Sequence, residues 1–127
     1  MLKQLALLFG LALTPTLAFA DKDFTDADGA TYDCAEDATV NITNGSGTFT
    51  LTGACKEINV NGSKLVVAIA DVEELNLNGA SNAVTAEVIG VIHINGAKNK
   101  VTWKKAKTGK KPSVATNGRG NSVAKAK

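Results

Sequence analysis

Apolar and polar residues alternate along much of this chain, and the alternation restarts at a fixed interval of 17 residues. The segment 58–62 reads Ile-Asn-Val-Asn-Gly, and segments of the same type begin at Leu75 and Ile92. Alternation with a period of two is typical of β-strands, whereas a constant longer period is typical of a solenoid. The pattern predicts an all-β fold, a small β-helix-like parallel β-solenoid with about 17 residues per turn. Ile58, Leu75 and Ile92 are expected to face its core.

Five Asn-Gly pairs mark the expected corners of the solenoid. Their glycines stand at positions 45, 62, 79 and 96, and then at 118 after an insertion of five residues, which predicts a loop at 109–113. Equivalent side chains of a parallel solenoid stack about 4.8 Å apart, so the asparagines of these pairs are expected to form a structural ladder of amide hydrogen bonds. The ladder residues are Asn44, Asn61, Asn78, Asn95 and Asn117. Asn-Gly is also a hairpin signal, and an antiparallel sandwich is therefore the competing fold.

Three further positions of the repeat predict columns of side chains that face the core. The first column holds Val67, Val84, Val101 and Val123, the second Ile69, Ala86 and Trp103, and the third Cys55, Val72, Ile89 and Ala106. Trp103 follows the small Ala86, and the middle of a packed core does not accommodate such an increase in volume. Trp103 is therefore expected to close the bottom of the core, with a platform for a sugar ring as the alternative interpretation.

The first 20 residues have the form of a secretory signal peptide. Lys3 supplies a positive charge, an apolar run extends over 5–13, and Ala-Phe-Ala at 18–20 forms a cleavage site. The apolar run is shorter than the ~20 residues of a spanning helix, which disfavours the alternative of a membrane anchor. The protein is therefore expected to be exported, to the periplasm or outside the cell.

Cys34 and Cys55 are the only two cysteines of the chain. An exported protein meets an oxidising compartment, and stacked positions lie within the Cα separation that a disulfide accepts, so these cysteines are expected to form a disulfide. Two free thiols are the alternative, and two cysteines with one histidine do not make a zinc site. The bond is expected to join an N-terminal cap, 21–38, to the solenoid, 39–124, which a basic tail at 125–127 follows.

Segments 79–84, 96–101 and 118–123 share the form Gly-x-x-Asn-x-Val. With the cysteine near the start of the domain, they resemble a family of bacterial exported proteins that carry repeated Gly-Ser-x-Asn-x-Val units and form a domain of unknown function. The resemblance implies a small β-solenoid-like domain and no assigned activity. The same unit is similar to the repeats of curlin, the subunit of secreted amyloid fibres. This chain lacks the glutamine columns of curlin, since its only glutamine is Gln4.

The chain offers little catalytic or metal-binding chemistry. His93, the only histidine, occupies an outward position that carries asparagine in the previous turn, and no acidic residue follows Glu87. The carboxylates at 71–74 are expected to be solvated, because a narrow solenoid has no deep cleft for paired acids. The segment 26–29 contains fragments of a calcium loop without its final glutamate. We therefore expect no enzyme, no metal and no cofactor, and a small carbohydrate-active β-helix enzyme is a remote alternative.

Charge is distributed very unevenly along the chain. Residues 21–90 carry 12 acidic and 3 basic side chains, whereas residues 91–127 carry 10 basic and no acidic ones. The candidate residues for a basic patch are Lys98, Lys100, Lys104, Lys105, Lys107, Lys110, Lys111 and Arg119. Such a patch attracts polyanions in a salt-dependent way, although lysines also improve solubility and protect open strand edges.

These observations leave three functional hypotheses. The first is a non-catalytic exported domain that binds an anionic glycan, lipid or other polyanion of the cell envelope through the basic patch. The second is head-to-tail assembly, in which the basic end of one copy meets the acidic end of the next. The third is the β-helix enzyme. Nucleic acid is not favoured as a partner, because only Trp103 lies among the lysines.

Overall fold

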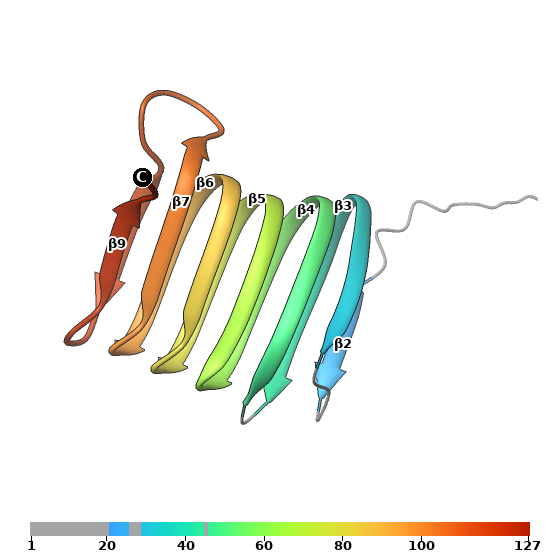
Figure 1. The fold of residues 1–127 in the computed structure, drawn as a ribbon, viewed down its shortest axis with the longest axis horizontal. Coiled ribbons are helices and arrows are strands. Elements are labelled where there is room, and N and C mark those ends of the chain that lie inside the picture. Colours follow the sequence, from blue (N-terminus) through green and yellow to red (C-terminus); the bar gives the residue numbers. More distant parts are fainter. Residues whose placement is uncertain (1–20, 26–28, 45) are drawn as a thin grey trace, which may run out of the picture.

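The computed structural model describes residues 21–25, 29–44 and 46–127, and it describes only the backbone of residues 21, 36, 37 and 44. Regular structure in this part of the chain consists of β-strands that wind into one continuous coil (Figure 1). The strands are β2 (Asp21–Thr25), β3 (Ala30–Asn44), β4 (Gly47–Ser63), β5 (Leu65–Ala80), β6 (Ala83–Ala97), β7 (Lys100–Ala106), β8 (Ser113–Asn117) and β9 (Ser122–Lys125). The predicted signal peptide lies outside the described residues. No membrane-spanning helix occurs within them.

The predicted parallel solenoid is confirmed. All strand pairs are parallel, and the coil makes about five turns of about 17 residues each. Ile58 lies opposite Leu75, and Leu75 lies opposite Ile92, so equivalent residues of successive turns are neighbours across the ladder. The parallel pairing excludes the antiparallel sandwich, in which hairpins would join neighbouring strands in opposite directions.

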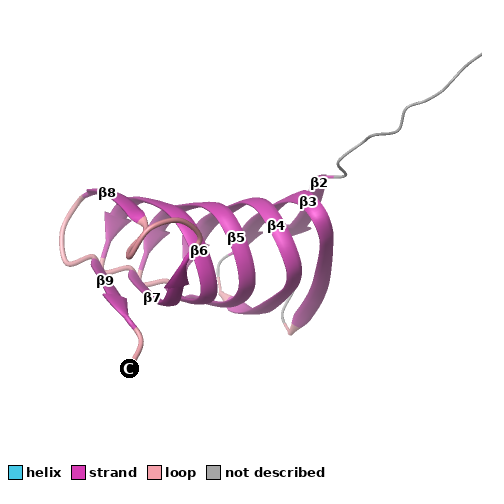
Figure 2. Cartoon of the chain, turned by 90° about the horizontal axis from the view of Figure 1, so that it is seen from above, coloured by secondary structure: helices cyan, strands magenta, loops and turns pink. Residues whose placement is uncertain are grey.

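The two terminal turns are divided between short strands. The strand β2 pairs with the second half of β3, so the segment expected to form a cap already contributes to the ladder. At the other end β8 pairs with β6 and β9 pairs with β7, and the inserted loop runs between β7 and β8 (Figure 2). The last turn is therefore assembled from two strands that follow an excursion of the chain.

The predicted inward columns form the core. Ile58, Leu75 and Ile92 are completely buried, and the three further columns are buried as well except at Val123, which is partly buried. Burying each valine, leucine or isoleucine contributes about 1.5–3 kcal/mol, and the β-branched residues suit the extended backbone. The core is thus a narrow rod of stacked side chains that runs along the axis of the coil.

The predicted disulfide between Cys34 and Cys55 is present, with the two Cα atoms 5.1 Å apart. The register between β3 and β4 is irregular near this bond, over residues 33–39 of β3. Both cysteines are buried, so the bond lies within the core and joins the first turns to each other. Closing a loop of this size is expected to stabilise the fold by about 3 kcal/mol.

The corner glycines are required by the stacking of the turns. Gly79 and Gly96 have φ angles of 127° and 140°, which side chains rarely adopt. A Cβ atom at Gly79 would also overlap the carbonyl oxygen of Gly62 in the preceding turn, and one at Gly96 would overlap that of Gly79. The Asn-Gly repeat therefore reflects backbone conformation and close approach of neighbouring turns at once.

Candidate functional site

The predicted asparagine ladder runs along the outer surface of the corners. The Nδ2 atom of Asn95 donates to Oδ1 of Asn78 at 3.3 Å, and Nδ2 of Asn117 donates to Oδ1 of Asn95 at 3.0 Å. Asn61 lies in register with Asn78, and the side chain of Asn44 is outside the described part of the structure. Each of these hydrogen bonds connects consecutive turns, so the ladder stabilises the stacking of the turns.

A second asparagine ladder, which we did not predict from the sequence, lies inside the molecule. Asn82 and Asn99 are 1 % and 0 % exposed, and Asn121 continues their column. Nδ2 of Asn82 donates to Oδ1 of Asn99 at 3.0 Å and to the carbonyl of Gly62 at 3.1 Å. The Oδ1 atom of Asn99 also accepts the backbone N–H of Asn82 at 3.1 Å. The constant place of asparagine within the Gly-x-x-Asn-x-Val units was the signal that could have revealed it.

A third column of polar side chains lies on the outer face of β2, β3, β4 and β5. It begins at Asp23, whose carboxylate accepts from Asn41, and continues through Asn59 to Asn76, with donor–acceptor distances of 2.8 Å at each step. His93 occupies the next position, in register with Asn76, and its side chain is exposed. His93 is thus a surface residue of an amide column, and its neighbours in register supply no carboxylate for a catalytic pair.

The acidic residues considered for catalysis lie at the surface and are exposed or partly exposed. The carboxylate of Asp71 forms an ion pair with Lys107 at 2.7 Å, and Glu74 lies in register with Glu57. Within the described residues no group of three or more histidine, cysteine, aspartate or glutamate side chains could hold a metal ion. The calcium-loop fragments at 26–28 lie outside the described residues.

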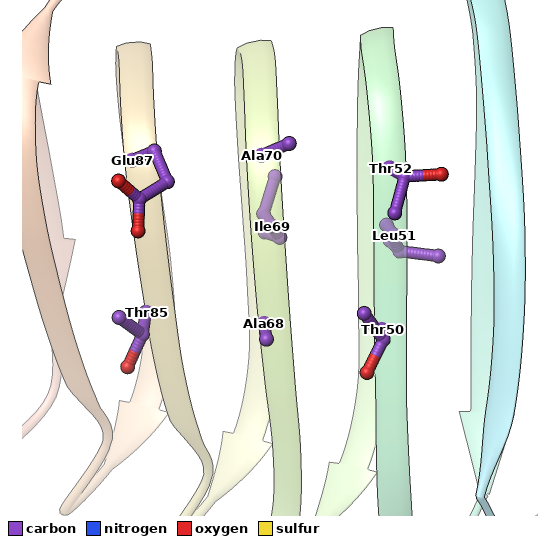
Figure 3. Close-up of a pocket in the computed structure, with 8 residues that line it drawn as sticks. All are labelled: Thr50, Leu51, Thr52, Ala68, Ile69, Ala70, Thr85 and Glu87. Atoms are coloured by element: carbon purple, nitrogen blue, oxygen red, sulfur yellow. The ribbon is translucent and has the colours of Figure 1, made fainter.

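The face formed by β4, β5 and β6 carries only a shallow depression of about 180 Å³. Figure 3 shows its short side chains in rows across the strands, with Thr50, Ala68 and Thr85 in one row and Thr52, Ala70 and Glu87 in another. Glu87 is its only charged residue, and it forms an ion pair with Lys104. Such a flat and mostly uncharged surface has little with which to orient a small polar ligand.

The candidate basic residues gather in two groups near the C-terminal end. We call the first the corner group; its members lie around the last corner, and they are Lys98, Lys100 and Arg119. The second, the loop group, occupies the end of β7 and the following loop, and its members are Lys104, Lys105, Lys107, Lys110 and Lys111. The main-chain N–H of Lys98 donates to the carbonyl of Arg119 at 2.9 Å, so the corner group combines residues from two turns.

Two residues of the loop group are already engaged with acidic residues. Lys104 lies 3.2 Å from Glu87, and Lys107 lies 2.7 Å from Asp71, two turns away. Gly90 lies beside the path of the Lys107 side chain, because a Cβ atom there would be 3.5 Å from Cδ of Lys107. In the part of the chain that the structure describes, no carboxylate lies within ion-pair distance of the other six candidate residues.

The N-terminal end of the core is covered by aromatic rings and a lysine. The ring centroids of Phe24 and Tyr32 are 5.9 Å apart, and Phe24 packs against Phe49 at 5.6 Å. The Nζ atom of Lys22 lies 5.3 Å from the centroid of Phe24. Lys22 is paired with the buried Val40 and thus occupies an inward position of the coil.

Trp103 closes the core near the C-terminal end, as predicted from its column. Its side chain is only 7 % exposed, which does not suit a platform for a sugar ring. Lys125 lies opposite Trp103 in the last turn, and its Nζ atom is 5.7 Å from the indole ring. Beside Trp103 a pocket of about 300 Å³ opens among β7, β8, β9 and the loop. Both ends therefore place a lysine over an aromatic ring at an inward position.

Comparison with known proteins returns one family. A family model described as "Protein of unknown function (DUF3060)" matches the chain twice, over residues 42–88 and 71–120. The two matches overlap, and together they span β4 to β8 and part of β3. No curated protein and no solved structure matches the chain.

Proposed function

The chain belongs to the DUF3060 family of proteins of unknown function, and from this premise we propose that it is a non-catalytic exported domain that binds a polyanion through its C-terminal basic surface. The family membership confirms the resemblance to a domain of unknown function drawn from the repeats. It supplies no activity, so the proposal depends on the surface chemistry of this chain.

The observation that carries the proposal is the segregation of charge along the coil. Residues 91–127 contain ten basic and no acidic side chains, and a solenoid keeps such a segment at one end of its axis. Six of the eight candidate residues are without an ion-pair partner among the described carboxylates. A surface of one sign concentrates ligands of the opposite sign and accelerates their association.

An exported location narrows the choice of polyanion. The disulfide is compatible with an oxidising compartment, and the first 20 residues have the form of a signal peptide. Anionic glycans and phosphate-bearing lipids of the cell envelope are the polyanions available there. Nucleic acid is a weaker candidate, because the only tryptophan is buried and leaves no exposed indole on which bases could stack.

The head-to-tail alternative meets a physical obstacle at both ends. Stacking a second copy would bury Lys22 of one molecule and Lys125 of the other, because both occupy inward positions. Burial of a charged ammonium costs several kcal/mol unless a carboxylate pairs with it. Inward-pointing charges are a known device against edge-to-edge association. The enzyme alternative is less favoured, because the depression on the face of β4, β5 and β6 is shallow and has Glu87 as its only charged lining residue.

Retention of the purified protein on heparin at increasing salt tests the proposal. Replacing Lys105, Lys110 and Lys111 together by glutamine should lower the affinity at least tenfold. The slope of log K against log salt should fall by about 0.7–0.9 for each lysine that no longer neutralises an anionic group of the ligand. Replacing Lys104 and Lys107, which already have acidic partners, should have a smaller effect per residue.

The matched control replaces Lys22, Lys56 and Lys64, which lie outside the basic surface, by glutamine. This variant has the same net charge as the first triple variant and should keep its retention apart from a small change due to net charge. Equally weakened retention of the two triple variants, or unchanged retention of the first, would reject the basic surface as the binding site.

A further inference from the structure

The pocket at the C-terminal end combines an apolar interior with positive charge. Its lining includes Trp103, Pro112, Val114 and Val123, with Lys111 and Lys125 as its charged members. The pocket has a volume of about 300 Å³, and its lining residues belong to β7, the end of the loop, β8 and β9. Figures 1 and 2 show the backbone of these segments at the C-terminal end of the coil. This volume is at the lower end of the range found for sites that bind small organic molecules.

The apolar lining is exposed because the last turn covers the core only in part. Val114 continues the column of Ile92, yet it is 48 % exposed, whereas Ile92 is completely buried. Val123 likewise continues the buried column of Val101 and is partly exposed. No further described strand pairs with β8 or β9 on their outer side. The pocket thus presents side chains of core type at the surface.

The charged members of the pocket have no acidic counterpart nearby among the described residues. Lys111 and Lys125 are exposed, and neither lies within ion-pair distance of a described carboxylate. The ammonium group of Lys125 rests 5.7 Å from the indole ring of Trp103, a contact of the cation–π type. An anion bound at these lysines would neutralise them while its remaining atoms contact the apolar lining.

These features favour a ligand that combines an anionic group with an apolar chain. A purely polar glycan would leave Val114, Val123 and Pro112 facing polar groups, and a purely apolar ligand would displace water from Lys111 and Lys125 without pairing with them. An acyl or alkyl chain that carries a phosphate satisfies both parts of the site. Charge complementarity and the exposed core residues therefore favour the same occupant.

We propose that this pocket binds a phosphate-bearing lipid, with the apolar chain against Val114, Val123 and Trp103 and the phosphate at Lys111 and Lys125. The inference rests on the proposed polyanion binding and deepens it, since it names the class of anion that the C-terminal end takes. The corner group and the rest of the loop group then supply the surrounding positive field.

A series of alkyl phosphates tests the proposal, with the fluorescence of Trp103, the only tryptophan, as the readout. Inorganic phosphate and butyl, hexyl and octyl phosphate are titrated at one ionic strength, below the concentrations at which they form micelles. The affinity should rise roughly fourfold for each added methylene until the pocket is filled, and the emission should shift as the chain approaches the indole. An affinity independent of chain length would overturn the proposal.

Two matched variants test whether octyl phosphate binds at this pocket. Val114→Ser should weaken octyl phosphate binding roughly fivefold and flatten the dependence on chain length. Val66→Ser is the control, because Val66 on β5 is 50 % exposed and lies outside the pocket. Val114→Ser is not expected to change the melting temperature appreciably, since that side chain is already half exposed. Equal weakening in both variants would reject the pocket as the site.

Retention on heparin separates this inference from the proposed function. Heparin retention without dependence on alkyl chain length overturns the lipid pocket and leaves polyanion binding in place. Binding of octyl phosphate at the pocket without heparin retention overturns the general polyanion surface. Absence of both rejects the two proposals together.

Discussion

The two ends of the coil cover the core to different extents. At the N-terminal end Phe24 and Tyr32 cover the core, and the disulfide between Cys34 and Cys55 joins the first turns. At the C-terminal end Trp103 closes the core one turn early, and the final turn beyond it leaves Val114 half exposed. The comparison shows that one end of the stack is covered by aromatic rings and joined by a disulfide, whereas the other end leaves a side chain of core type half exposed.

The two ends of the coil also differ in charge. Aspartates and glutamates belong to the first 90 residues and lysines dominate the last turns, while each end keeps one inward lysine over an aromatic ring. Inward-pointing charges are expected to disfavour stacking of copies at both ends. Lys125 differs from Lys22 because it also lines the pocket at the C-terminal end.

The largest expected effect concerns the aromatic residues that close the core. Trp103→Ala should lower the free energy of unfolding by about 3–5 kcal/mol, because it leaves a large cavity in a buried site. Phe24→Ala should cost about 1–2 kcal/mol, because Phe24 is only partly buried. Urea unfolding of the two variants and the unmodified protein measures both values. Equal destabilisation would contradict the view that the C-terminal closure is the more deeply buried one.

Removal of the disulfide should act on the N-terminal end with the next largest effect. Replacing Cys34 and Cys55 together by serine should lower the free energy of unfolding by about 3 kcal/mol, since the closed loop of the unfolded chain is released. Hydrogen exchange should rise first in β2 and β3 and should change little in β7 to β9. A uniform rise along the coil would show that the bond does not stabilise one end selectively.

A smaller effect is expected within the buried asparagine ladder, which runs towards the open end. Asn99→Ala removes the acceptor of the buried Asn82 side chain and should cost roughly 2–3 kcal/mol. Asn121→Ala removes the corresponding acceptor of Asn99, yet it should cost only about 1 kcal/mol, because water reaches the last turn. Thermal unfolding compares the two. Greater destabilisation by Asn121→Ala would show that the C-terminal end is better sealed than the exposure of its residues indicates.

The smallest effect concerns association rather than the stability of one molecule. Replacing Lys22 and Lys125 by leucine removes the inward charge at both ends and should tighten self-association by about tenfold. Size-exclusion chromatography at several concentrations measures this, with Lys56→Leu and Lys64→Leu as the charge-matched control. If the unmodified protein self-associates as tightly as the double variant, the inward lysines do not limit stacking.

Much of the fold followed from the repeat alone. The period of 17, the inward position of Ile58, the disulfide and the closure by Trp103 were all predicted and are confirmed. This was possible because each turn of a solenoid contacts mainly the next turn, so equivalent positions have equivalent surroundings. The outer asparagine ladder followed from the same reasoning and is observed from Asn78 to Asn117.

The features that were not predicted depend on which way a side chain points and on how deeply it is buried. No role was predicted for the asparagine of each Gly-x-x-Asn-x-Val unit, whose side chain is buried in Asn82 and Asn99 and hydrogen-bonds to backbone groups. The pairing of Lys107 with Asp71, 36 residues away, joins two turns across Gly90. The loop after β7 lets the last turn divide between β8 and β9, which opens the pocket.

The sequence by itself determined the parallel coil, its period, its core columns, the cysteine pair and the concentration of positive charge in the last 37 residues. Local alternation and strict repetition suffice for these, because they depend on which residue stacks on which. Only the tertiary structure decided which asparagines are buried, which lysines have acidic partners and where core side chains reach the surface. Those properties arise at the corners and at the two ends of the coil, where the depth of a side chain depends on which segments of the chain cover it.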